Sequence, residues 1–251
     1  METPAERAGA TAPRQKSATS EIRYRDRRHG GRVLASALAK YAGRDDVVVL
    51  ALPRGGVPVA YEVAKGLRAP LDVFIVRKLG LPGDEEIAMG AIASGGVRVL
   101  NADIVDGLDI SSEVIDAVAD AEQKELERRE RAYRSDRRPI DVEDRIVVLV
   151  DDGLATGSTM SAAVEGVKRH NPRRVVVAVP IASPATCEEI AEQVDEIVCA
   201  ATPEPFLAVG LWYADFEQTS DDEVRALLNE TRVFMDPERP RAAKRPRAGA
   251  R

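Results

Sequence analysis

The sequence has few of the residues that build metal centres or disulfide frameworks. Its 251 residues include two cysteines and two histidines. Cys187 and Cys199 are too few for a disulfide framework, and His29 and His170 stand too far away in the sequence to suggest a zinc site. We therefore expect reduced thiols and a cytoplasmic protein.

Long apolar runs and a strong excess of one charge are also missing. No apolar run approaches the roughly 20 residues that a transmembrane helix needs, so no membrane contact is expected. The first 20 residues contain no apolar segment, which argues against a secretory signal. The formal net charge of -6 does not indicate nucleic-acid binding. The sequence also shows neither a serine nucleophile elbow nor a Cys/His dyad.

The two ends differ in composition from the rest of the chain. Residues 1–21 are rich in Ala, Thr, Pro, Ser and charge, and are predicted to be a disordered tail. Residues 237–251 carry many Arg and Lys but a single Glu, which predicts a basic disordered tail; we favour a solvated tail over one that binds nucleic acid or polyphosphate. One domain is expected over residues 22–236.

Within this domain, β-branched apolar runs alternate with helical patterns. Buried strands without polar alternation, separated by helices, predict a mostly parallel sheet flanked by helices on both faces, an α/β fold. A pair of short strands or a hairpin is expected over residues 90–101. The predicted strands are 47–52, 71–79, 145–151, 173–180 and 195–200, and the predicted helices are 32–41, 57–67, 111–134, 158–170 and 183–194.

Three loops follow strands of this sheet, where α/β proteins bind ligands. They read "PRGG" after the first strand, "RKLGLPGDEE" after the second and "DDGLATGST" after the central one. The last is the most informative. Gly153 and Gly157 let several N–H groups turn towards one point, and the hydroxyls of Thr156, Ser158 and Thr159 add donors at the start of a helix. This loop is predicted to bind a monophosphate group.

Two adjacent carboxylates, Asp151 and Asp152, precede the phosphate loop. Carboxylates accept hydrogen bonds only, so they require hydroxyl donors or a divalent cation. Neighbouring hydroxyls beside a phosphate describe a ribose 5-phosphate. We therefore expect the aspartates to bind sugar hydroxyls, directly or through Mg²⁺. The bland alternative is a helix-capping Asp followed by a Gly-rich turn.

The segment "VVLVDDGLATGST" resembles the phosphoribosyl pyrophosphate (PRPP) motif of type I phosphoribosyltransferases, in the form with Ala before Thr-Gly that adenine enzymes carry. "LPRGG" resembles the pyrophosphate loop of this family and "VRKLGLPGDEE" its flexible catalytic loop, in the same order. The stretch "TPEPFLAVGLWYADFEQTSDDEV" adds a likeness to the bacterial subfamily named "putative phosphoribosyltransferases".

This resemblance implies transfer of the 5-phosphoribosyl group from PRPP to a nitrogenous base with release of pyrophosphate. It implies Mg²⁺ as cofactor, held at Asp151 and Asp152, and a homodimer. The ribose 5-phosphate would contact the aspartates and the loop residues Gly153, Leu154, Ala155, Thr156, Gly157, Ser158 and Thr159.

The other two loops would act on the pyrophosphate. Arg54 would supply a cation, and Gly55 and Gly56 backbone N–H groups, with a non-proline cis peptide expected at Arg54–Gly55. Arg77 and Lys78 would be the catalytic cations at the start of a lid. The acids of this lid fit solvation better than metal binding.

The acceptor base stays open. Ala155 stands where 6-oxopurine enzymes carry an Asp, and Ala88 stands where adenine enzymes carry a Glu. A hood over residues 201–220 contains clustered aromatics, and Trp212 and Tyr213 are the candidates to stack on a base. Equally, this cluster could pin the C-terminal segment to the sheet.

Two other activities use the same pocket. One is a PRPP sensor without transferase turnover, suggested by the acidic lid and the basic tail. The other is a hydrolase of PRPP or of a nucleotide. The sequence shows no helix-turn-helix segment, so the sensor is not expected to bind DNA with this chain.

Overall fold

Five apolar strands form a parallel sheet in the computed structural model, which describes residues 24–134 and 138–231. The strand order is β2-β1-β6-β7-β8. The bounds are Val47–Ala51 for β1, Leu71–Val73 for β2, Ile146–Val150 for β6, Arg174–Ile181 for β7 and Glu196–Ala201 for β8. All four neighbouring pairs are parallel, which confirms the predicted α/β fold.

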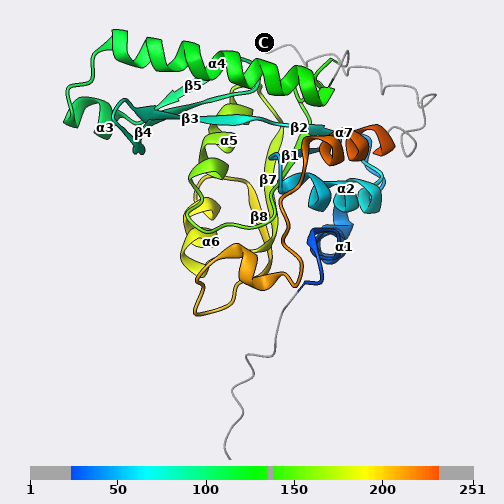
Figure 1. The fold of residues 1–251 in the computed structure, drawn as a ribbon. Coiled ribbons are helices and arrows are strands. Elements are labelled where there is room, and N and C mark those ends of the chain that lie inside the picture. The colour runs from blue at the N-terminus through cyan, green and yellow to red at the C-terminus, as the bar shows by residue number, and fades with distance from the viewer. Residues whose placement is uncertain (1–23, 135–137, 232–251) are drawn as a thin grey trace, which may run out of the picture.

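Each face of this sheet buries its own core, because successive side chains of a strand point to opposite faces. Val147 and Leu149 of β6 pack with α5 and α6, whereas Val148 and Val150 pack with α1, α2 and α7. Figure 1 shows these helices on the two sides of the sheet. The bounds are Arg27–Ala37 for α1, Gly56–Leu67 for α2, Ser158–Lys168 for α5, Pro184–Ala191 for α6 and Asp221–Glu230 for α7.

Helix α1 begins at Arg27, five residues before the predicted start at Arg32. Asp26 caps it by accepting a hydrogen bond from the backbone N–H of His29 at 2.6 Å. A short 3₁₀ helix, η1, spans Ala39–Tyr41. The sequence prediction misses the first turn because Arg27 and Arg28 add no apolar periodicity.

The predicted strand 71–79 is in fact two strands in different sheets. After β2, β3 (Val76–Leu81) pairs antiparallel with β4 (Asp84–Ala93), which pairs with β5 (Val97–Leu100). The N–H of Ile75 donates to the Ser94 hydroxyl at 2.9 Å where the chain changes sheets. A continuous apolar run cannot reveal such a change, because residues 71–75 are all buried on both sides of the point where the chain changes sheets. The predicted lid is thus a β-hairpin that turns at Pro82 and Gly83.

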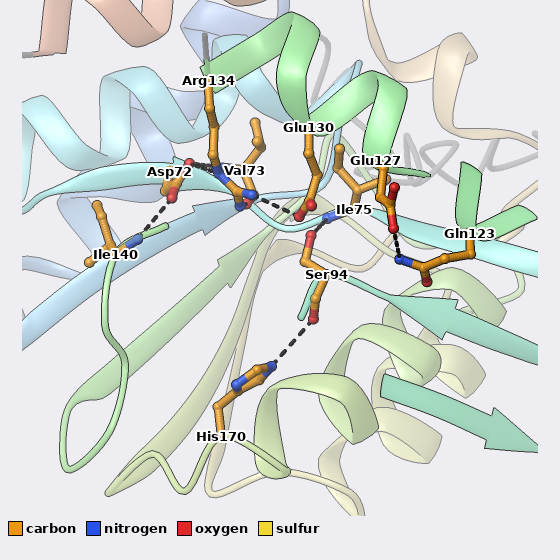
Figure 2. Close-up of polar contacts among 10 residues, drawn as sticks. All are labelled: Asp72, Val73, Ile75, Ser94, Gln123, Glu127, Glu130, Arg134, Ile140 and His170. Carbon is orange, nitrogen blue, oxygen red and sulfur yellow. Dashed lines mark hydrogen bonds and ion pairs between the residues drawn. The ribbon is translucent and has the colours of Figure 1, made fainter. Parts of the chain in front are cut away.

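Helix α4 (Ser112–Arg134) lies along the three-stranded sheet, at the top of Figure 1, and α3 (Ala102–Gly107) precedes it. Its last residue, Arg134, is buried and pairs with Asp72 of β2 at 2.9 Å. The Arg134 guanidinium also donates to the Val73 carbonyl at 2.6 Å and pairs with Glu130, and the Ile140 N–H donates to Asp72 at 3.1 Å. Figure 2 shows this cluster, which joins the end of α4 to the edge of the parallel sheet.

The residues just before α1 form backbone hydrogen bonds with the hood, although the two segments are far apart in the sequence. The N–H of Tyr24 donates to the Trp212 carbonyl at 2.8 Å, and the N–H of Ala214 donates to the Tyr24 carbonyl at 2.7 Å. Trp212 ends the 3₁₀ helix η2 (Val209–Trp212). Tyr24 is therefore held against the hood by backbone hydrogen bonds on both sides.

The expectation of reduced cysteines is wrong for this structure. Cys187 of α6 and Cys199 of β8 form a disulfide, with their Cα atoms 7.0 Å apart. They stand 12 residues apart in sequence, and the fold brings them together because α6 packs against β8. A count of cysteines gives no sign of this proximity.

Some predictions concern parts of the chain that the structure does not describe. The predicted tails, 1–21 and 237–251, lie outside residues 24–134 and 138–231. Within those described ranges, no helix combines the length and the apolar character needed to span a bilayer.

Candidate active site

The loop after β6 is anchored at its middle by Leu154. The Leu154 N–H donates to the Ile181 carbonyl at 2.9 Å, and its carbonyl accepts from the Ser183 N–H at 3.0 Å. Its side chain is buried in the core. Leu154 thus fixes the loop to β7, while Ala155 and Thr156 beyond it are exposed at the end of the sheet.

The second half of the loop leads directly into α5. Gly157 has a φ of 72°, in the left-handed region, and a β-carbon on it would lie 2.7 Å from a Thr186 methyl group. The Thr186 hydroxyl donates to the Ala155 carbonyl at 2.6 Å, so α6 supports the loop from below. No side chain caps the start of α5, and Ser158 and Thr159 are exposed there. The first N–H groups of α5 are therefore available to an anion.

The two aspartates lie side by side where β6 ends. Asp151 accepts a hydrogen bond from the backbone N–H of Asp152 at 2.8 Å. Burial raises the pKa of Asp151 well above its ordinary value, and the neighbouring Asp152 charge adds to this effect. Burial also raises the pKa of Asp152, although Arg27 acts in the opposite direction. The pair is a concentrated, poorly solvated site of negative charge.

Arg27 is a residue of this site that sequence reasoning missed. Its Nε lies 2.7 Å from Oδ2 of Asp152, and the two side chains are only 12% and 16% exposed. Arg27 opens α1, which lies 125 positions before the aspartate in sequence. An arginine in a charged N-terminal stretch gives no local signal of such a partner.

The "PRGG" loop lies directly against the aspartates. A β-carbon on Gly55 would overlap Oδ2 of Asp152, and one on Gly56 would lie 3.0 Å from Oδ1 of Asp151. The N–H of Gly56 donates to the Leu52 carbonyl at 3.1 Å. The structure thus brings together two of the three predicted loops, from the ends of β1 and β6.

Two details of the "PRGG" loop differ from expectation. The non-proline cis peptide lies at Pro53–Arg54, one bond before the predicted Arg54–Gly55. Arg54 Nη1 lies 3.6 Å from Asp221 of α7, and the Tyr133 hydroxyl of α4 donates to the same carboxylate at 2.8 Å. The Arg54 side chain therefore extends to the start of the C-terminal helix.

Arg77 and Lys78 lie on β3, in the hairpin. Arg77 donates to Glu122 of α4 at 2.6 Å, and both side chains are about a quarter exposed. Both cations line a cavity of about 580 Å³ between the hairpin and α4, together with Gly80, Pro82, Val118 and Glu122 among others. The contact that the structure gives Arg77 is thus to α4.

In the hood, Tyr213 and Trp212 occupy different environments. Tyr213 is buried, its hydroxyl donates to the Asp152 carbonyl at 2.6 Å, and its ring stacks on Phe216 at 5.0 Å. Desolvation on burial strongly raises the pKa of Tyr213, and the negative charge of Asp152 raises it further. Trp212 is half-buried. Its indole N–H is buried and has no hydrogen-bond partner among the described residues.

The two carboxylates of Asp151 and Asp152 suit a Mg²⁺ ion that is shared with a substrate better than a metal ion bound by protein ligands alone. Among the residues that the structure describes, no group of three or more His, Cys, Asp or Glu side chains could hold a metal ion. Asp151 and Asp152 alone supply two carboxylates. Mg²⁺ is commonly bound by one or two carboxylates that it shares with substrate phosphates and water.

Comparison with known proteins gives one family. A sequence model described as the phosphoribosyl transferase domain matches residues 82–206, which include the loop Asp151–Thr159. "Putative phosphoribosyl transferase Rv0571c" of Mycobacterium tuberculosis is 51% identical over 206 residues, 82% of this chain and 46% of that protein. The chain thus spans about half the length of this curated relative.

Two further proteins are similar. "Bifunctional protein PyrR" of Clostridium acetobutylicum is 32% identical over 152 residues, which are 60% of this chain and 65% of that protein. TT1426 from Thermus thermophilus, whose crystal structure is known, is 45% identical in sequence. The match covers 83% of this chain and 98% of the TT1426 chain, and the two structures superpose with a TM-score of 0.73. With the domain match, the M. tuberculosis relative and the aspartate–glycine loop in place at the end of β6, the chain belongs to the phosphoribosyltransferase family.

Proposed function

We propose that this protein transfers the 5-phosphoribosyl group of PRPP to a nitrogenous base and releases pyrophosphate. The observation that carries the proposal is the contact between two strand ends. Gly55 and Gly56 pack on Asp152 and Asp151, beside the uncapped start of α5. One ligand can therefore reach a glycine turn, a carboxylate pair and a helix N-terminus together, and PRPP carries groups that suit all three.

Each part of the site has a role in binding. The carboxylates of Asp151 and Asp152 accept hydrogen bonds from the ribose hydroxyls. The amides that open α5, with the Thr156, Ser158 and Thr159 hydroxyls, bind the 5-phosphate. Because the Leu154 amide is already bonded to Ile181, Leu154 supports the loop and does not donate to the ligand.

The pyrophosphate lies at the end of β1 in this proposal. The Gly56 N–H already donates a hydrogen bond to the Leu52 carbonyl. We therefore assign the Gly55 N–H as the donor to pyrophosphate. Arg54 supplies positive charge once it turns from Asp221, 3.6 Å away in this structure. Arg77 and Lys78 supply more, and Arg77 must leave Glu122 to do so.

The reaction needs little covalent chemistry from the protein. The bond between C1 and the pyrophosphate oxygen breaks with its electron pair on the oxygen, and the base nitrogen donates a lone pair to C1. The protein holds the ring, stabilises the leaving group and excludes water. Mg²⁺, held by Asp151 and Asp152 together with the substrate, would supply Lewis-acid stabilisation of the pyrophosphate.

The base would bind under the hood, against Trp212. Tyr213 is buried between Tyr24 and Phe216, so its role in this proposal is to anchor the hood to Asp152. Strand β8, which carries Cys199, leads into this segment. A homodimer is part of the proposal by likeness to the family.

A panel of bases tests the function directly. The protein is incubated with PRPP, Mg²⁺ and each of a set of purines and pyrimidines, and pyrophosphate release is measured. Release that depends on one base supports the transferase. Release without any base indicates a hydrolase, and tight PRPP binding without turnover across the panel indicates a sensor.

A double variant tests the pocket. Asp151→Asn with Asp152→Asn should abolish PRPP binding measured by calorimetry, while circular dichroism reports an intact fold. Glu127→Gln serves as the control, since Glu127 is an exposed residue of α4 that pairs with Arg131 and lies outside the proposed contacts. Unchanged PRPP affinity in the double variant would remove the basis of the proposal.

A further inference from the structure

Arg27 makes three contacts with parts of the chain that are far apart in sequence. Its Nε donates to Asp152 at 2.7 Å, and its Nη1 donates to the Glu217 carbonyl at 2.6 Å. Its guanidinium carbon lies 3.8 Å from the centre of the Phe216 ring. The side chain is 12% exposed, so these contacts replace most of its hydration.

The hood and the aspartate pair also meet on a second path. The Tyr213 hydroxyl donates to the Asp152 carbonyl at 2.6 Å, and Tyr213 stacks on Phe216. The N–H of Asp215 donates to the Arg25 carbonyl at 2.9 Å, two residues before Arg27. The position of Asp152 and the position of the hood are therefore held by one connected set of contacts, which includes the ion pair between Arg27 and Asp152.

We propose that Arg27 is a positioning residue that couples Asp152 to the aromatic hood, so that the ribose side and the base side of the pocket are ordered together. This inference rests on the proposed function. Arg27 reaches the substrate through Asp152: it fixes which way the carboxylate points and compensates one of two neighbouring negative charges. The same guanidinium holds the rim of the hood through Phe216 and Glu217.

The chemistry of arginine is needed for both contacts. A guanidinium is a planar group with several N–H donors, so it can pair with a carboxylate, donate to a carbonyl and stack on a ring at once. A lysine ammonium can keep the charge beside Asp152 but has no flat face for Phe216. Arg27→Lys therefore separates the charge at Asp152 from the connection to the hood.

The chain offers a direct reporter of the hood. Trp212 is its single tryptophan, so intrinsic tryptophan fluorescence comes from the hood alone. In the protein without ligand, Arg27→Gln and Asp152→Asn should each increase acrylamide quenching of Trp212. The double variant should be no more quenched than the stronger single variant, because both changes break the same ion pair between Arg27 and Asp152. Additive effects, or no effect of Arg27→Gln, would overturn the coupling.

PRPP binding gives the second measurement. Arg27→Gln should weaken PRPP affinity about tenfold, the scale of a lost hydrogen bond to a charged group. Arg27→Lys should retain affinity close to the wild type but show the increased quenching of Trp212. If Arg27→Lys weakens PRPP binding as well as increasing the quenching of Trp212, or changes neither, the two roles are not separated by the guanidinium and the inference fails.

Arg28→Gln is the matched control. Arg28 is the next residue of α1 and pairs with Glu62, and Arg32 also contacts Glu62 and remains in the variant. This variant should match the wild type in quenching and in PRPP affinity. If the wild type itself binds no PRPP, the proposed function fails, but the quenching measurements still decide whether Arg27 couples Asp152 to the hood.

Discussion

Gly55 lies so close to Asp152 that a β-carbon at this position would overlap the carboxylate oxygen Oδ2. The backbone of Gly55 has φ -60° and ψ -33°, which any residue can adopt. Glycine is therefore required here for space and not for conformation. The contact sets the distance between the loops that follow β1 and β6.

A Gly55→Ala substitution tests this contact. We expect PRPP affinity to fall at least tenfold, because the added methyl group must displace Asp152, and stability to fall by about 1–3 kcal/mol from overpacking. Calorimetry and urea denaturation measure the two effects. Gly107→Ala is the control, since a β-carbon there meets nothing within 4 Å. Equal behaviour of the two variants would show that the loops are not in contact.

The buried pair of Arg134 and Asp72 predicts a large effect on stability. Arg134→Ala leaves Asp72 buried without its cation, and we expect a loss of about 3–5 kcal/mol in the free energy of unfolding. Arg131→Ala removes an exposed partner of Glu127 on the same helix and should cost less than about 1 kcal/mol. Urea denaturation compares them. A small effect at Arg134 would mean that α4 is not fastened to β2.

The aspartate pair predicts that stability depends on pH in a direction unusual for carboxylates. The folded pKa of Asp151 is raised above its ordinary 3.8, so the folded state binds the proton more tightly than the unfolded state. The contribution of Asp151 to the free energy of unfolding should therefore fall as pH rises from about 3.8 through the raised pKa. Asp151→Asn should flatten this fall and make the protein more stable at pH 7.

Thermal unfolding across pH in metal-free buffer measures the effect. Glu165→Gln is a suitable control, since Glu165 is on the surface of α5 and pairs only loosely with Lys168 at 3.9 Å. A wild-type protein whose stability rises steadily through this range, with no difference in Asp151→Asn, would contradict the raised pKa.

The disulfide between Cys187 and Cys199 predicts a measurable loss of stability on reduction. Closing a loop of this length contributes about 3 kcal/mol in the chain-entropy account. Reduced wild type and Cys187→Ser should unfold at the same lower urea concentration. Alkylation of the unfolded, unreduced protein gives the direct check, and two reactive thiols would show that the bond is not formed.

Much of the architecture could be predicted from local patterns. Strands β1, β6 and β7 are continuous apolar runs, and the predicted bounds of each lie within a few residues of those observed. The rule that ligands bind at strand ends also selects "PRGG" and "DDGLATGST", which the structure places in contact. Their roles in binding PRPP remain predictions.

Other features could not be found this way. The change of sheet at Phe74 and Ile75 lies inside one apolar run, so periodicity gives no boundary. Arg77 is predicted from its place at the end of a predicted strand, but its partner Glu122 belongs to α4, which is distant in sequence and packs on the hairpin in the folded protein.

The sequence by itself determined the parallel sheet and the aspartate–glycine loop, because apolar runs, glycines and adjacent carboxylates act over a few neighbouring residues. Only the tertiary structure decided which groups complete the site. Arg27 meets Asp152 across 125 positions, and Tyr213 meets it across 61. Such pairs depend on how the sheet lays distant segments side by side, and no local pattern encodes that distance.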